Sequence, residues 1–194
     1  SDDAFVTQDF RRSAGELPER KPEHITEQSL VALKDTRYLR TYRTGLWVLP
    51  EVRIVYIVRN PCAMLNSWWT SKEFPDGCDI YQEWRTGRCR KAEGEREYWG
   101  FEDWISQTFA FQDLHRRFPQ SVHIVQYEML ITQPSHVLSA LSEFLDMDLM
   151  NESLNFLRQS HANPDERRFS VWKSTDVKDK WRQEFPSDIV EQIQ

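Results

Sequence analysis

Long hydrophobic runs and an excess of positive charge are both missing from this chain of 194 residues. The best apolar stretch, Val52 to Val58, is short and contains Arg53, whereas a membrane span needs about 18 consecutive apolar residues. The 25 basic side chains are outnumbered by 31 acidic ones, which gives a formal charge of −6. A nucleic-acid partner is not expected, because counterion release needs basic side chains in excess on one face. The aromatic content of 13% argues against a disordered chain.

Cysteine is scarce, and its spacing does not suit a metal. Cys62, Cys78 and Cys89 form no C-x-x-C pair, and the five histidines form no H-x-x-x-H pair. No zinc site is therefore expected. Cys78 and Cys89 bracket a polar, turn-rich segment, so they can either close a small disulfide loop or remain reduced. Cys62 lies in an apolar helical pattern and is expected to be a buried free thiol.

Strand patterns and helix patterns alternate along the chain. Residues 52–58 and 122–127 are rich in β-branched and aromatic side chains and are the two clearest strands. Asn60-Pro61 predicts a helix start, because Asn is a good N-cap and Pro suits the first helical position. Apolar stripes predict further helices at 102–118 and 137–147.

This order of elements predicts an α/β fold, a parallel sheet with flanking helices. We expect a single domain over residues 1–194, with an irregular insertion at 75–100, where four of the six glycines lie. In such sheets ligands bind beyond the carboxyl ends of the strands. Arg59-Asn60 and Tyr127-Glu128 each follow a strand, and they are therefore expected on the rim of a binding site.

The segment from Arg59 to Ser67 has the residues of an anion site. A strand ends, a guanidinium follows, and a helix then begins with free backbone N–H groups and the positive end of its dipole. Ser67 lies nearly two helical turns beyond Asn60, so its hydroxyl returns to the same side of the helix. Arginine and serine together can hold a phosphate monoester. The alternative is an arginine paired with a neighbouring acid and a serine that only lines the helix.

Four segments occur in an order that is typical of one enzyme family. They read I-V-Y-I-V-R-N-P at 54–61 with Ser67 after it, Q-Y-E-M-L at 126–130, L-K-D-T-R at 33–37, and R-F-S followed by K-W-R within 168–182. Together they resemble the nucleotide-binding core of sulfotransferases, which use 3′-phosphoadenosine 5′-phosphosulfate (PAPS). The last two are similar to segments of the carbohydrate sulfotransferase branch.

The resemblance, which covers roughly residues 30 to 194, implies roles for five side chains. Arg59 and Ser67 are expected to bind the 3′-phosphate, and Tyr127 is expected to lie near the adenine. Arg168 and Ser170 are expected to close over the nucleotide. The alternatives are a core aromatic at the end of a strand for Tyr127 and a solvated loop for Arg168 and Ser170.

The function implied is sulfuryl transfer from PAPS to a hydroxyl group, on a carbohydrate rather than on a small phenol, with no metal. Two other functions stay open. One is a sulfotransferase-like module that binds a nucleotide or a partner without catalysis. The other is a phosphate-handling α/β enzyme such as a nucleotide kinase, although no two glycines have the G-x-x-x-x-G-K-[ST] spacing. Carbohydrate-type motifs favour the lumen of the secretory pathway, for example the Golgi, over the cytoplasm. The oligomeric state is not indicated.

One departure from the family concerns the loop that holds the 5′-phosphosulfate, P-K-S-G-T-T-W or similar. No glycine of this chain is followed by Ser or Thr, so the loop is absent. We expect a fragment that lacks the first strand and loop, in preference to a diverged member that cannot catalyse alone. The catalytic base is not assigned; Glu23 and His24 are the nearest candidate pair, and a surface loop is the favoured alternative. Lys34 and Arg37 can face an anionic acceptor or form a structural ion pair.

Overall fold

The computed structural model describes residues 51–70, 77–90, 100–147, 154–155, 158–159, 162 and 175–194. All of them belong to one compact unit of the chain, residues 37–194. Its described sheet has two parallel strands, β1 (Ile54–Val58) and β2 (Val122–Gln126). Ile54 lies opposite Val122, and Val58 lies opposite Gln126. The prediction of an α/β fold with a parallel sheet is confirmed.

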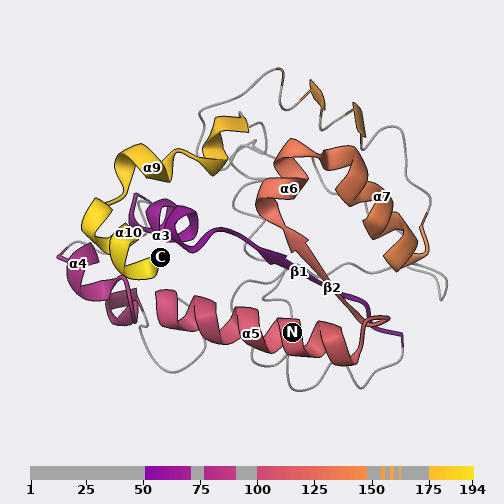
Figure 1. Ribbon diagram of the computed structural model, residues 1–194, viewed down its shortest axis with the longest axis horizontal. Coiled ribbons are helices and arrows are strands. Elements are labelled where there is room, and N and C mark those ends of the chain that lie inside the picture. Colours follow the sequence, from indigo (N-terminus) through magenta and orange to yellow (C-terminus); the bar gives the residue numbers. More distant parts are fainter. Residues whose placement is uncertain are drawn as a thin grey trace, which may run out of the picture. The chain divides into compact units, whose positions relative to one another are not determined.

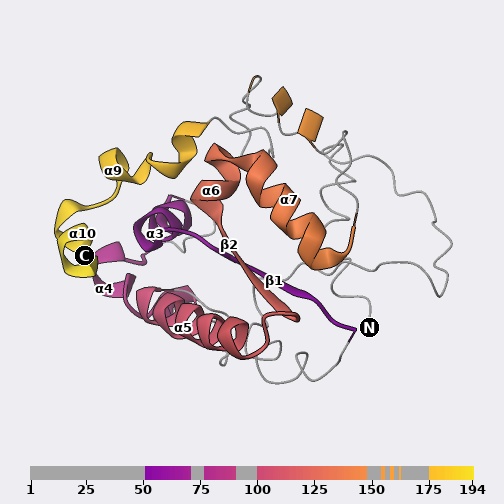
Figure 2. The same ribbon diagram turned by 45° about the vertical axis from the view of Figure 1, so that its right-hand side comes forward.

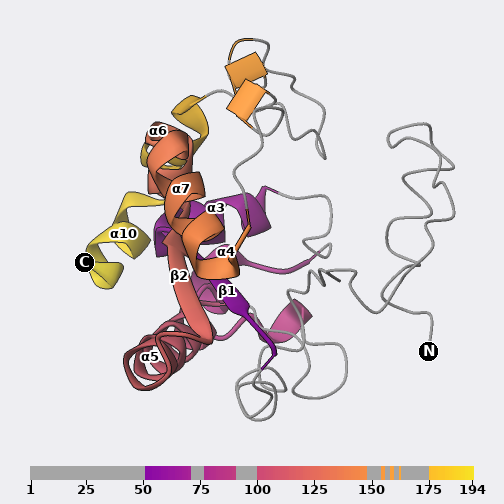
Figure 3. The same cartoon turned by 90° about the vertical axis from the view of Figure 1, so that its right-hand side faces the viewer.

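Helices surround the two strands. The longer ones are α3 (Pro61–Trp69), α5 (Phe101–Arg117), α6 (Tyr127–Thr132), α7 (Pro134–Leu145) and α10 (Ser187–Ile193). The shorter ones are α4 (Ile80–Glu83), η2 (Arg88–Arg90), η3 (Thr175–Lys178) and α9 (Trp181–Glu184). The strands run between α5 on one side and α6 with α7 on the other (Figures 1 and 3). Beyond the carboxyl end of β1, α3 lies together with α9 and α10 (Figure 2).

The start of α3 is determined by its local sequence. The Asn60 side chain accepts a hydrogen bond from the Ala63 amide at 3.2 Å, and Pro61 occupies the first helical position. Both features follow the ordinary chemistry of helix N-termini. The helix ends at Trp69, and the expected helix start at Asn60-Pro61 is confirmed.

The start of α5 requires a glycine. Gly100 has φ of +98°, and a Cβ on it would lie 2.5 Å from the Arg85 carbonyl oxygen. This close approach lets the Phe101 amide donate to the Trp84 carbonyl at 2.8 Å and the Glu102 amide donate to the Arg85 carbonyl at 2.9 Å. Trp84 and Arg85 are thereby tied to the first turn of α5.

Two apolar clusters form the described core. The first joins the sheet to α5 through Phe111, Leu114 and Val122, and the Tyr56 and Phe111 rings stack with their centroids 4.2 Å apart. The second joins α3 to α4, α9 and α10. Its buried members are Cys62, Ala63, Leu65, Trp68, Ile80, Trp84, Trp181, Phe185 and Ile189. The C-terminal helices are therefore fixed to α3, which follows the carboxyl end of β1.

The segment 77–90 holds a disulfide between Cys78 and Cys89, whose Cα atoms are 6.1 Å apart. The sequence had left the state of this pair open. The Glu83 carboxylate accepts a hydrogen bond from the Cys89 amide at 3.0 Å and closes the same loop. Cys62 is buried and free, as expected.

One element was missed by the sequence patterns. Tyr127, expected as the last residue of the second strand, is instead the first residue of α6, because β2 ends at Gln126. The strand-like composition continues past the point where the backbone turns into a helix. Within the described part of the chain, no helix has the length and apolar character that crossing a membrane demands.

Candidate functional site

Arg59 follows the last residue of β1 and is half-buried. Its guanidinium lies over the Tyr127 ring, with Cζ 4.8 Å from the ring centroid, and its Nη2 donates to the Val177 carbonyl at 3.1 Å. Its backbone carbonyl accepts a hydrogen bond from Trp104 Nε1 at 2.9 Å. Among the described residues, its Nε is buried without a hydrogen-bond partner. A buried donor of this kind carries a desolvation cost that an anionic ligand would remove.

The turn between β1 and α3 is held by α6. The Asn60 amide donates to Glu128 Oε1 at 2.9 Å, and Glu128 is the second residue of α6. Both strands end here, so the starts of α3 and α6 lie side by side at the carboxyl edge of the sheet (Figure 1). We call Arg59, Asn60, Tyr127, Glu128 and Val177 the carboxyl-end cluster.

The first turn of α3 offers fewer amide donors than the sequence suggested. Pro61 has no amide hydrogen, the Ala63 amide donates to the Asn60 side chain, and the Met64 amide donates to the Asn60 carbonyl at 2.9 Å. The expectation of free amide groups at this helix start is therefore wrong for these positions, because the asparagine cap satisfies them.

Ser67 is the seventh residue of α3. Its side chain is exposed, between the buried side chains of Asn66 and Trp68. The structure thus brings Arg59 and Tyr127 into contact and places Ser67 further along the helix that follows Arg59. The role expected for Ser67 stays a prediction.

Several expected site residues lie outside the described residues. They are Arg168 and Ser170, and the candidates for base or acceptor contacts, Glu23, His24, Lys34 and Arg37. The roles expected for them stay predictions. Among the residues that are described, no three or more His, Cys, Asp or Glu side chains gather into a metal-binding group.

Polar contacts connect α3 to the C-terminal helices. Asn66 Nδ2 donates to Glu184 Oε2 at 2.9 Å, and Lys180 Nζ lies 3.1 Å from Glu184 Oε1. The Asn66 hydrogen bond is the main cause that lowers the pKa of the Glu184 carboxyl, with Lys180 adding to it. Burial raises the pKa of the Cys62 thiol, although its own backbone and the charge of Arg182 partly oppose the shift.

Three of the contacts that shape this site were not predicted from the sequence. They are the carbonyl of Val177 on Arg59, the carboxylate of Glu128 on the Asn60 amide, and the Trp104 indole on the Arg59 carbonyl. Only Glu128 had a signal in the sequence, since its place after a strand put it on the expected rim of the binding site.

Comparison with known proteins identifies the family. The family model described as "Sulfotransferase domain" matches residues 19–194, which is most of the chain. The chain belongs to the sulfotransferase domain family. No curated protein and no solved structure matches it.

Proteins of this family are transferases that move a sulfuryl group. The matched range contains the carboxyl-end cluster and all five residues expected to bind the nucleotide.

Proposed function

We propose that this chain binds PAPS through its 3′-phosphate at the carboxyl end of β1 and transfers the sulfuryl group to a hydroxyl of a carbohydrate. Arg59 and Ser67 would hold the phosphate, and Tyr127 would lie against Arg59 beside the adenine. Bound PAPS supplies the activated sulfuryl group. The chain's own residues supply binding and orientation of the nucleotide.

The observation that carries this proposal is the state of Arg59. Its guanidinium lies over the Tyr127 ring and is fixed at Nη2 by a backbone carbonyl, while its buried Nε has no partner among the described residues. A guanidinium fixed in this way is organised for charge-assisted hydrogen bonds to a phosphate. Family membership says which phosphate-bearing donor to expect.

Two observations support the finer parts of the proposal. The carbohydrate acceptor rests on the K-x-x-R and R-x-S…K-W-R segments, which resemble the carbohydrate branch. The disulfide between Cys78 and Cys89 supports an oxidising compartment, the lumen of the secretory pathway, because such bonds are rare in the cytosol.

Calorimetric titration with two nucleotides tests the proposal. Adenosine 3′,5′-bisphosphate, the desulfated product, carries the 3′-phosphate, and adenosine 5′-monophosphate lacks it. We expect micromolar binding of the bisphosphate and at least tenfold weaker binding of the monophosphate. Arg59→Ala should weaken binding of the bisphosphate by about 100-fold, the loss of a charge-assisted hydrogen bond of about 2–3 kcal/mol.

Arg53→Ala is the matched control, since Arg53 precedes β1 as Arg59 follows it, and is exposed. It should bind the bisphosphate as the unmodified chain does. Arg59→Lys, which keeps the charge but not the planar fork, should fall between the two. Equal affinity of the unmodified chain for both nucleotides would contradict the proposal, and so would undiminished binding by a folded Arg59→Ala.

A further inference from the structure

A lysine directly follows the residue whose carbonyl binds Arg59, in a segment far away in the sequence. The Val177 carbonyl accepts the hydrogen bond of Arg59 Nη2 at 3.1 Å, and Lys178 is the next residue of η3. The segment η3 packs against α6, which supplies Tyr127 to the other side of the guanidinium. The backbone that carries Lys178 therefore lies within one hydrogen bond of the candidate phosphate ligand.

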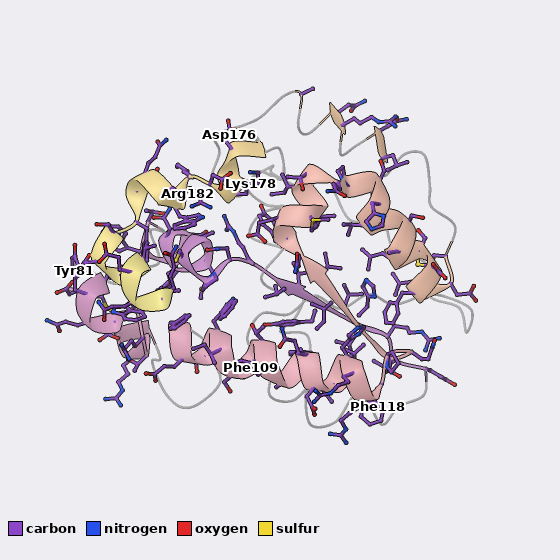
Figure 4. All side chains as sticks on the ribbon, in the orientation of Figure 1. Tyr81, Phe109, Phe118, Asp176, Lys178 and Arg182 are labelled. Carbon is purple, nitrogen blue, oxygen red and sulfur yellow. A yellow bond between two sulfur atoms is a disulfide. The ribbon has the colours of Figure 1, made fainter. Side chains whose placement is uncertain are left out.

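Lys178 differs from the other cations of its segment. Its side chain is 30% exposed, whereas those of Lys180 and Arg182 are 64% and 62% exposed. In Figure 4, Asp176 extends from the outer side of η3, while Lys178 lies on the side of η3 that is turned toward α6. Lys178 is thus the least exposed of these three cations, and it adjoins Val177 of the carboxyl-end cluster in the chain.

Asp179, which pairs with Lys178, would keep a second partner if Lys178 moved away. The Asp179 carboxylate pairs with Lys178 through Oδ2 and with Arg182 Nε through Oδ1 at 3.0 Å. Both contacts lower the pKa of Asp179, that of Lys178 the more. If Lys178 moves away, Arg182 remains to neutralise the carboxylate. The two side chains are 30% and 46% exposed, and an ion pair open to solvent contributes little, so breaking it costs little.

The charge of a phosphate monoester calls for more than one cation. At pH 7 its charge lies between about −1.5 and −2, and Arg59 supplies one positive charge. Glu128 adds a carboxylate to the same cluster, where it accepts the Asn60 amide. A phosphate next to Arg59 would therefore lack a full counter-charge unless a second cation moved in.

We propose that Lys178 is a second phosphate ligand, whose ammonium group moves from Asp179 to a phosphate monoester bound at Arg59. The inference rests on the proposed function, because it takes the nucleotide 3′-phosphate to be the ligand. No bond is made or broken other than hydrogen bonds and ion pairs. Lys178 contributes a mobile point charge, and Arg59 contributes the fixed planar fork.

Substitutions at two lysines of the 194-residue chain test this assignment. Lys178→Gln removes the proposed ligand, and Lys180→Gln removes a neighbouring lysine that pairs with Glu184 at 3.1 Å. Calorimetric titration should show that Lys178→Gln weakens binding of adenosine 3′,5′-bisphosphate by about tenfold, as for one partly screened charge contact. Its binding of adenosine 5′-monophosphate should change less than about twofold. Lys178→Arg, which keeps the charge, should recover most of the loss.

The control separates a ligand from a general electrostatic effect. Lys180→Gln should leave binding of both nucleotides within about twofold of the unmodified chain, the scale of a screened surface charge. If Lys180→Gln weakens the bisphosphate as much as Lys178→Gln does, the assignment is overturned. It is likewise overturned if Lys178→Gln affects both nucleotides equally.

Failure of this inference differs from failure of the proposed function. If the unmodified chain does not prefer the bisphosphate, the proposed function fails and the Lys178 assignment fails with it. If Arg59→Ala abolishes the preference while Lys178→Gln keeps it, the phosphate site stands and only the role of Lys178 is wrong.

Discussion

Both ends of β1 carry an arginine over an aromatic ring, yet the two guanidinium groups are held differently. Arg53 lies before the strand with Cζ 6.0 Å from the Phe144 ring centroid, and Arg59 lies after it, 4.8 Å from that of Tyr127. Arg53 is exposed, whereas Arg59 is half-buried, fixed by a carbonyl and left with a buried Nε that lacks a partner among the described residues. For Arg53 the ring contact is therefore surface packing, whereas for Arg59 it is one of several contacts that hold the guanidinium in place.

The helices explain why the two ends differ. At the carboxyl end of the sheet α3 and α6 begin, and the positive ends of their dipoles favour an anion. At the amino end α5 finishes, and its last turn places His115 against β2, with Nδ1 2.7 Å from the Val122 carbonyl. The His115 ring also lies 6.3 Å from that of His123. The amino end thus gathers two histidines, and the carboxyl end gathers Arg59 and the starts of two helices.

The largest effect on stability should come from a residue that packs against the middle of β1, between its two ends. Phe111 is 1% exposed and stacks on Tyr56 in the middle of β1, so Phe111→Ala should lower the free energy of unfolding by about 3–5 kcal/mol. Urea denaturation measures this change. Phe109, on the same helix, is 67% exposed, and Phe109→Ala should change the value by about 0.5 kcal/mol or less. Similar losses for the two variants would show that α5 does not pack on the sheet through Phe111.

A smaller effect should be confined to the carboxyl end. Glu128→Ala leaves the Asn60 amide without its acceptor and should lower the free energy of unfolding by about 1–2 kcal/mol. Glu128→Gln keeps a carbonyl acceptor and should recover most of the loss. In NMR spectra the histidine resonances of the amino end should not move in either variant. A shift of these resonances would show that the two ends of β1 are coupled and do not act separately.

The smallest effect should be a pH dependence confined to the amino end. Burial, and then the neighbouring His115, lower the pKa of His123 below its usual 6.5. The unfolded chain therefore takes up this proton before the folded chain does, and stability is lost as the pH falls below about 6.5. His123→Gln should reduce this loss in urea denaturation between pH 7.5 and 5.5. His136→Gln, an exposed site on α7, should keep the slope of the unmodified chain; a slope that depends equally on both residues would refute this explanation.

Local sequence was sufficient for the elements that frame the site. The β-branched run at 52–58 contains β1, and the Asn60-Pro61 pair starts α3 through the capping bond that its chemistry predicts. Placing Arg59 after a strand and before a helix needed only these neighbours. The parallel pairing of the two strands followed from the helical crossover between them.

The contacts that distinguish Arg59 from Arg53 could not be predicted from the sequence. Val177 is 118 residues from Arg59, and Glu128 is 68 residues from Asn60, so no local pattern links the partners. Tyr127 was assigned to a strand because its aromatic side chain fits the strand composition, while the backbone turns into α6 one residue earlier. Such contacts depend on how the chain packs, which periodicity and capping signals do not encode.

NMR of the arginine Nε–H groups distinguishes directly whether Arg59 or Arg53 binds the phosphate of the nucleotide. The two resonances are assigned from Arg59→Lys and Arg53→Lys spectra. On titration with adenosine 3′,5′-bisphosphate, the Arg59 Nε–H resonance should move strongly, because its buried Nε gains a phosphate acceptor, while that of Arg53 stays in place. Adenosine 5′-monophosphate should move neither. An unmoved Arg59 resonance at saturating bisphosphate, or an equal shift of Arg53, would show that Arg59 is not the specific ligand of the 3′-phosphate.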